Sequence, residues 1–224
     1  MNLFGLILTI ILFFIFKRFN LKIPIIISVG VLIILILKIF NINYATYNES
    51  ASILSFLIAP ATIALALPMY KNYHILLTNK RALYPALILA TIIAIISTYF
   101  CAKFFKADFN VIMSMIPKST TMPIALEISK NIDGICEITA VVVALTGVFG
   151  GVFGHKILKL LKVKNDVAIG LALGSASHVI GTASCAERKK EKQVATSAIA
   201  LIIVGLLSAI IIPIFAHKFL FVIQ

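Results

Sequence analysis

One histidine lies inside a segment made almost entirely of small and apolar residues. His178 stands within the stretch 170–184, which is rich in Gly, Ala, Ser and Thr and holds no other charged residue. Ionisable side chains at membrane depth are rare and usually functional, and an imidazole gains or loses a proton near neutral pH. We therefore interpret His178 as the residue that couples the movement of an anion to protons. The alternative is a neutral histidine bonded to a nearby backbone carbonyl.

A lysine and three hydroxyl side chains stand between two prolines in a second segment. These polar residues are Lys118, Ser119, Thr120 and Thr121. Pro117 and Pro123 interrupt helical hydrogen bonding, and the backbone N–H groups left free there can bind an anion. A helix that begins near Pro123 would also direct its positive end at that anion. We interpret the group as a site for a small carboxylate. The alternative is an exposed loop with a solvated lysine.

Glycine and threonine continue the histidine segment. Gly181 and Thr182 offer free amides and one hydroxyl that could complete the anion site, and Gly174 marks a further point at which the helix could break. Small residues also let helices approach closely, so tight packing is the alternative for all of them.

No pattern typical of an enzyme or of a metal site is present in the sequence. Cys101, Cys136 and Cys185 lie in or beside apolar runs, far apart and without metal-ligand spacing. Motifs of serine hydrolases, phosphate-binding loops and zinc proteases are absent. We therefore expect no enzymatic activity, no metal and no cofactor.

The composition requires lipid as the solvent for much of the chain. Of the 224 residues, 61% are apolar and 12% are charged, and a core of this size cannot hide such an apolar excess from water. The net charge of +12 would suggest a nucleic-acid partner in a soluble protein. Basic residues also accumulate in cytoplasmic loops of membrane proteins, so we expect a multi-pass protein of the plasma membrane that binds no nucleic acid.

Apolar runs predict an all-α membrane protein with about six spanning helices. The runs are Leu3–Phe16, Ile23–Leu37, Ala51–Leu67, Ala82–Ala102, Ile138–Gly154 and Val194–Ala216. The first two are shorter than the ~20 residues that cross a bilayer, and flanking basic side chains can make up the difference. The third run contains Pro60 and Thr62 and predicts a helix with a break.

Two further apolar segments, Phe109–Lys130 and Val167–Ala186, are irregular and hold the candidate site residues. If Val167–Ala186 enters and leaves on one side, the basic loops 155–166 and 187–192 both become cytoplasmic. We therefore expect two re-entrant or broken segments that enter from opposite faces. Secondary transporters with inverted repeats have this arrangement, and an inverted repeat is left open here. Full crossing by both segments is the alternative.

Three of these stretches, in this order, resemble the LrgB/CidB family. They are Ala59–Lys71, Pro117–Ser129 and Gly174–Ala183. The resemblance implies one LrgB-like membrane domain over residues 1–224, with an N-terminal helix pair at 1–40 and a family core at 45–216. Ser184 stands where the family usually has an arginine, which leaves the identity of the substrate open.

The resemblance also implies two alternative functions. Related proteins include a plastid glycolate/glycerate transporter and bacterial proteins linked to pyruvate uptake, which implies a proton- or cation-coupled carrier of small monocarboxylates. The family was named for antiholin-like effects on murein hydrolase activity and autolysis, exerted with a small holin-like partner of the LrgA/CidA type. The glycine pairs 147/151 and 150/154 could contact such a partner or only pack the chain's own helices. A homo-oligomer is left open as well.

Overall fold

The computed structural model of the chain is entirely helical in the part that it describes. That part consists of residues 3–19, 25–57, 60, 63–64, 66–71 and 73–220, and it contains no strand. The all-α architecture predicted from the apolar runs is therefore confirmed. Contacts divide the chain into two compact units, residues 1–64 and 65–224. The candidate residues at positions 117–123 and 174–182 all belong to the second unit.

The N-terminal unit contains the predicted helix pair, and a further helix packs against it. Its helices are α1 (Phe4–Phe19), α2 (Ile25–Ile39) and α3 (Tyr44–Phe56). The backbone N–H of Gly5 donates to Ser50 Oγ over 2.9 Å, and the hydroxyls of Thr9 and Tyr47 are 2.8 Å apart. These two contacts join α1 to α3 through polar groups that an apolar environment would otherwise leave unpaired.

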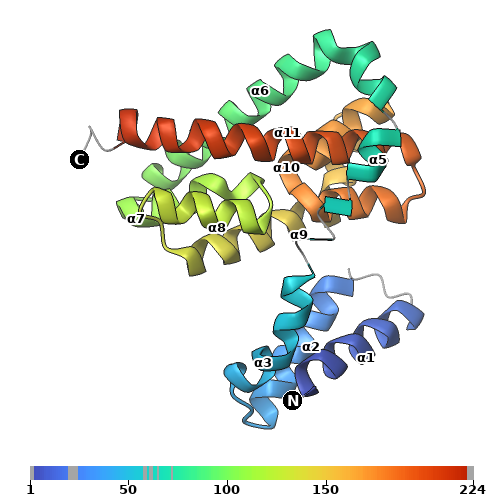
Figure 1. Cartoon of the computed structure of the whole chain (residues 1–224), viewed down its shortest axis with the longest axis vertical. Coiled ribbons are helices and arrows are strands. Elements are labelled where there is room, and N and C mark those ends of the chain that lie inside the picture. The colour runs from blue at the N-terminus through green and yellow to red at the C-terminus, as the bar shows by residue number, and fades with distance from the viewer. Residues whose placement is uncertain are drawn as a thin grey trace. The chain divides into compact units, whose positions relative to one another are not determined.

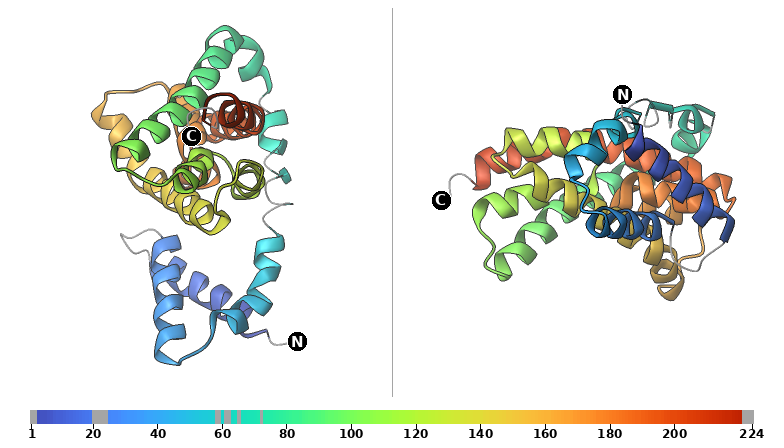
Figure 2. Two further views of the ribbon diagram at one scale, coloured as in Figure 1. Left: turned by 90° about the vertical axis from the view of Figure 1, so that its left-hand side faces the viewer. Right: turned by 90° about the horizontal axis from the view of Figure 1, so that it is seen from below.

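Long helices form the scaffold of the second unit. They are α6 (Tyr73–Phe104), α9 (Cys136–Leu160) and α11 (Glu191–Phe215), which continues as a short π-helical turn, η2 (Ala216–Leu220). Leu83 of α6 packs with Ile199 near the start of α11, and Ile95 packs with Ile212 near its end. Helices α6 and α11 therefore run in the same direction. Figure 1 shows α11 lengthwise, and the left view of Figure 2 looks nearly along it.

The first irregular segment folds back on itself. Its parts are α7 (Phe109–Met115), the 3-10 turn η1 (Ile116–Ser119) and α8 (Met122–Asn131). Ile112 of α7 and Ile128 of α8 share one core with Ile212 near the end of α11. The backbone N–H of Ile135, beyond α8, donates to Ser114 Oγ over 2.7 Å. Both arms therefore lie at the C-terminal end of α11, where Figure 1 shows α7 and α8. The turn η1 and Thr120 connect the two arms. We name Phe109–Asn131 hairpin 1.

The second irregular segment also reverses direction. Helix α10 (Asp166–Glu187) is interrupted at His178, whose φ of 41° and ψ of −131° lie outside the helical region. The backbone of Gly181 packs against the carbonyl group of Leu173. In a straight helix these two residues would be separated by ~12 Å along the axis. Their contact therefore requires that the chain turns back at His178, and we name Asp166–Glu187 hairpin 2.

Both ends of hairpin 2 lie at the N-terminal end of α11. Gln193 Nε2, in the first turns of α11, donates to Asp166 Oδ1 over 2.7 Å. His155 Nε2, near the end of α9, is 3.0 Å from Gln193 Oε1. Glu187 is followed by a short turn that leads directly into α11. The two hairpins therefore enter from opposite ends of α11, which is the arrangement predicted for the two irregular segments.

The number of long apolar helices differs from the expected six. By length and composition, the candidates for crossing a membrane among the described residues are Lys80–Phe104, Cys136–Leu160, Asp166–Glu187 and Glu191–Lys218. The third of these is hairpin 2, which qualifies by length but turns back at His178. Helices α1 and α2 have 16 and 15 residues, and they are shorter than a bilayer core requires. The run 51–67 was predicted to be a helix with a break, and α3 does end at Phe56, before Pro60. The next labelled helix is α5 (Ala66–Lys71).

The second unit separates its charges between the two ends of α11. The N-terminal end, which we name the basic end, carries Lys71, Lys80, Arg81, Lys156, Lys159, Lys162, Lys164, Arg188, Lys189, Lys190 and Lys192 against Asp166, Glu187 and Glu191. The opposite end has balanced charges, with Lys103, Lys106, Lys130 and Lys218 against Asp108, Glu127, Asp133 and Glu137. This asymmetry is typical of a membrane protein whose basic end faces the cytoplasm.

Candidate functional site

A pocket of about 520 Å³ lies where the tip of hairpin 1 meets α9 and the first arm of hairpin 2. Lys118 of η1, Thr146 of α9 and Ser177 of α10 form its polar lining. The remaining lining residues are Leu145, Phe149, Gly150, Gly154, Ile157, Leu158, Ala172, Leu173 and Ala176. The fold therefore brings the two segments that the sequence singled out to one place, which we name the Lys118 pocket.

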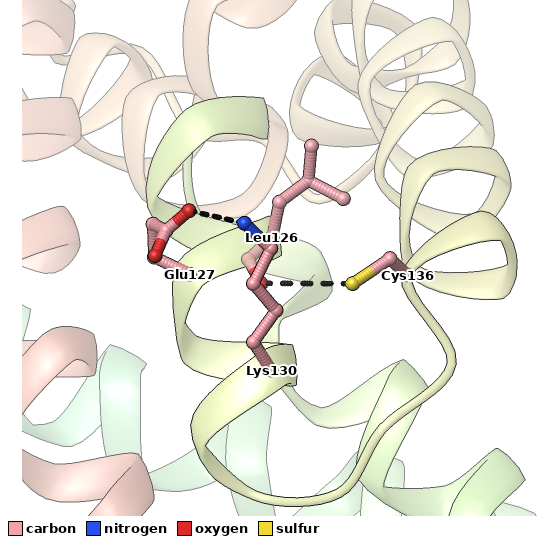
Figure 3. A network of polar contacts seen from close by, with 4 residues as sticks. All are labelled: Leu126, Glu127, Lys130 and Cys136. Atoms are coloured by element: carbon pink, nitrogen blue, oxygen red, sulfur yellow. Dashed lines mark hydrogen bonds and ion pairs between the residues drawn. The ribbon is translucent and has the colours of Figure 1, made fainter.

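Lys118 is half-buried and has no acidic partner among the described residues. The acidic residue nearest to it in sequence, Glu127, instead accepts a hydrogen bond from Lys130 over 2.7 Å (Figure 3). Both of those side chains are largely exposed, so the pair lies at the protein surface. Figure 3 also shows Cys136 Sγ directed at the carbonyl oxygen of Leu126, which joins α8 to the start of α9. Lys118 therefore lines a mainly apolar pocket, and no carboxylate in the described part of the chain pairs with its ammonium group.

The three hydroxyl residues after Lys118 are buried. Ser119, Thr120 and Thr121 are 7%, 1% and 3% exposed, which contradicts the alternative of an exposed loop. Thr120 Oγ1 has no hydrogen-bond partner among the described residues, and it lies beside Gly205 of α11. A buried hydroxyl without a partner costs about 1–3 kcal/mol, so this oxygen is suited to a polar ligand or water. None of the three residues lines the Lys118 pocket itself.

The expected helix after these hydroxyls is present. Helix α8 begins at Met122, with Thr121 as its N-cap and Pro123 in its first turn. Pro117 stands in η1 and is buried, whereas Pro123 is exposed. A proline has no backbone N–H that could be left unpaired where a helix begins. Both prolines are therefore compatible with the break between the two arms of hairpin 1.

His178 is buried at the tip of hairpin 2 and packs against α9. Its side chain is 4% exposed, and its Nε2 lies 3.1 Å from the carbonyl oxygen of Val143. A carbonyl oxygen can only accept, so Nε2 is the protonated nitrogen. The ring lies close to Gly147, where a β-carbon would overlap it. Ser177, the residue before His178, lines the Lys118 pocket. The geometry therefore matches the histidine bonded to a backbone carbonyl, which was the alternative interpretation.

The other residues of hairpin 2 hold the hairpin closed. Thr182 Oγ1 donates to the carbonyl of His178 over 3.1 Å and is 2.7 Å from Ser197 Oγ of α11. Gly174 packs on the backbone of Ser197, and Gly181 packs on the first arm of the hairpin. Neither Gly181 nor Thr182 lines the Lys118 pocket. Their contacts correspond to tight packing, which was the alternative for these positions.

The glycines of α9 face hairpin 2. A β-carbon at Gly150 would overlap Ser177, one at Gly151 would crowd Ile180, and one at Gly154 would overlap Leu173. The glycine pairs 147/151 and 150/154 therefore pack the chain's own helices. Their spacing was visible in the sequence, but it did not identify α10 as the neighbour, and Thr146 and Ser177 were missed as pocket residues for this reason.

Two of the predicted break positions cannot be related to the pocket. Pro60 is helical and exposed and belongs to the N-terminal unit. Thr62 lies outside the described residues.

The chain is similar to known proteins along most of its length. A model of the LrgB-like family matches residues 6–218. The chain is 36% identical over 221 residues to the antiholin-like protein LrgB of Bacillus subtilis (strain 168), and the match covers 96% of this chain and 95% of that protein. No solved structure matches the chain.

Proposed function

Since the chain belongs to the LrgB-like family of membrane proteins, we propose that it carries small monocarboxylates across the bilayer, coupled to protons or another cation. The observation that carries this proposal is Lys118, which has no acidic partner among the described residues and lines a pocket between two opposed hairpins. A lysine at membrane depth is costly unless an anion compensates it. A carboxylate substrate would supply that anion.

The architecture supports the proposal. Non-helical backbone at membrane depth occurs where it is buried in protein or lines a wet cavity, and transporters use such interruptions as binding sites. Here Lys118 and Ser177 come from hairpins that enter from opposite ends, and they line one pocket. A relative movement of the hairpins would expose that pocket first to one side and then to the other.

The pocket has the composition expected for a short, partly apolar acid. Its ammonium group would bind the carboxylate, while the hydroxyls of Thr146 and Ser177 would bind a 2-oxo or 2-hydroxy group. The apolar walls would accept the short carbon chain. We further propose that Thr120, whose hydroxyl has no partner within the described ranges, binds substrate or water when the hairpins move. We also propose that transport involves no catalytic step.

His178 is the proposed site of proton coupling. It follows Ser177 of the pocket, and its Nδ1 is the ring nitrogen that does not face Val143. Protonation would place a second positive charge near the pocket and would increase its affinity for an anion. Release of the proton on the other side would lower that affinity again.

A second function is favoured by the printed name of the relative, antiholin-like protein LrgB. In this reading the chain is a regulator in the plasma membrane that acts with a small holin-like partner on murein hydrolase activity. The function requires a stable complex with the partner and no solute movement through this chain.

Uptake into proteoliposomes distinguishes the two functions. Purified protein would be reconstituted with and without a holin-like partner and supplied with labelled pyruvate, lactate, glycolate or glycerate under an imposed pH gradient. The carrier function predicts uptake that depends on the gradient. Absence of uptake of all four acids in both preparations would reject the carrier and leave the regulator.

A pair of lysine variants then tests the pocket. Lys118→Gln should reduce uptake at least tenfold, because a hydrogen bond to a charged group is worth about 1.5–3 kcal/mol. Lys159→Gln is the control, since Lys159 is exposed near the end of α9 and does not line the pocket. Equal uptake by the two variants would contradict the assigned role of Lys118.

A further inference from the structure

A second pocket lies at the basic end of the second unit, away from Lys118. Its volume is about 400 Å³, and it lies between α5 and the turn that joins hairpin 2 to α11. Leu67, Ala186, Val194 and Ala195 supply apolar walls. Its charged lining consists of Lys71, Lys189, Lys190 and Glu191. We name it the Lys71 pocket.

The turn that carries two of these lysines has a defined backbone. Lys189 has a φ of 55°, and its N–H donates to the carbonyl of Ala186 over 2.9 Å. The carbonyl of Lys190 accepts from the N–H of Val194 over 3.0 Å as α11 begins. These bonds hold the two lysines at the rim of the pocket, on the side opposite Lys71 of α5.

The charges of the pocket are not balanced. The lining contains three lysines and one carboxylate, Glu191, and all four of these residues are exposed. None of the three lysines has an ion-pair partner among the described residues. The rest of the basic end adds further cations, which repel other cations and attract anions.

Two tyrosines beside Lys71 indicate at which depth of the membrane this pocket lies. Tyr70 precedes Lys71, and its ring is stacked on that of Tyr73 with the centroids 6.3 Å apart. Both rings are exposed. Exposed tyrosines in membrane proteins gather at the headgroup level, where one part of the ring contacts hydrocarbon and the hydroxyl contacts water. A pocket at this level is open to phospholipids from the leaflet beside it.

We propose that the Lys71 pocket binds the headgroup of an anionic phospholipid. The lysine ammonium groups would bind the phosphate diester and any further negative group of the headgroup, while the apolar walls would contact the first part of the acyl chains. Basic pockets at the cytoplasmic ends of membrane helices bind anionic lipids through this combination of charge and apolar contact. The site is independent of the proposed transport function, because it shares no residue with the Lys118 pocket.

Native mass spectrometry of the full chain tests the proposal. Delipidated protein in a neutral detergent would be titrated with phosphatidylglycerol or with phosphatidylcholine of the same acyl chains. We expect the first bound phosphatidylglycerol to be preferred at least tenfold over phosphatidylcholine. The triple variant Lys71→Gln, Lys189→Gln, Lys190→Gln should lose this preference, because one lysine near an anionic lipid accounts for about a fivefold change in affinity.

A matched control removes the same charge from the same end. Its substitutions are Lys159→Gln, Lys162→Gln and Lys164→Gln, at exposed positions outside the pocket. The control should keep the preference for phosphatidylglycerol. Equal loss in both triple variants would overturn the proposal, because the preference would then follow total charge. Displacement of the lipid by millimolar inorganic phosphate would also overturn it in favour of a simple anion site.

Discussion

Replacing Gly174 by alanine tests directly whether the first arm of hairpin 2 lies against α11. The new methyl carbon would overlap the carbonyl of Ser197 and would lie 2.7 Å from its Cα and 2.8 Å from its carbonyl carbon. All three atoms belong to the backbone, so no side-chain rotation can relieve the overlap. The φ of Gly174 is not positive, and alanine is therefore excluded by packing and not by its own conformation.

Two opposing effects set the change in the free energy of unfolding that Gly174→Ala causes. Forcing an extra carbon into a well-packed contact costs about 1–3 kcal/mol, and the backbone contact places this case near the upper limit. The better helix propensity of alanine returns up to about 1 kcal/mol. We expect a net loss of about 2 kcal/mol in the free energy of unfolding, which corresponds to a decrease of about 4–8 °C in Tm for a chain of this length.

The assay is thermal unfolding of the detergent-solubilised chain, with Gly30→Ala as the matched control. Gly30 is also a helical glycine, and a β-carbon at this position would meet no atom within 4 Å. The control should therefore keep or slightly raise the Tm. If Gly174→Ala unfolds at the same temperature as the control, the first arm of hairpin 2 does not pack on the Ser197 backbone, and its placement against α11 is wrong.

Three further predictions concern the same elements. In a cysteine-free background, Lys164→Cys and Lys189→Cys should react with an impermeant thiol reagent from the same side of the membrane, whereas labelling from opposite sides would mean that α10 crosses fully. Thr182→Val should cost about 1–3 kcal/mol in the free energy of unfolding, because it removes two buried hydrogen bonds, one to the carbonyl of His178 and one to the hydroxyl of Ser197. Ser52→Ala, at an exposed position, should change the Tm little, and an equal loss in both would refute this. Glu127→Gln should leave uptake unchanged, because this carboxylate pairs with a surface lysine and not with the pocket lysine; a loss of uptake would contradict that assignment.

The sequence by itself determined that much of the chain lies in lipid, that the fold is all-α, and where the two irregular segments interrupt the apolar helices. Apolar runs located α11 to within three residues and the start of α9 to within two, because a lipid environment demands long apolar stretches. Helix α9 continues six residues beyond the predicted end at Gly154. The two prolines around the hydroxyl residues located the tip of hairpin 1, because proline removes helical hydrogen bonds wherever it stands. The basic loops indicated that both ends of hairpin 2 lie on one side.

Tertiary structure alone decided what each polar residue does. The reversal of α10 occurs at His178, which is neither glycine nor proline, so the residue type gave no signal of it. Thr120 and Thr182 look equivalent in sequence, but Thr182 is bonded on both sides, whereas Thr120 has no partner among the described residues. These differences arise from contacts between residues far apart in the chain. A local pattern specifies which groups can form hydrogen bonds, and only the fold specifies which of them remain free for a ligand.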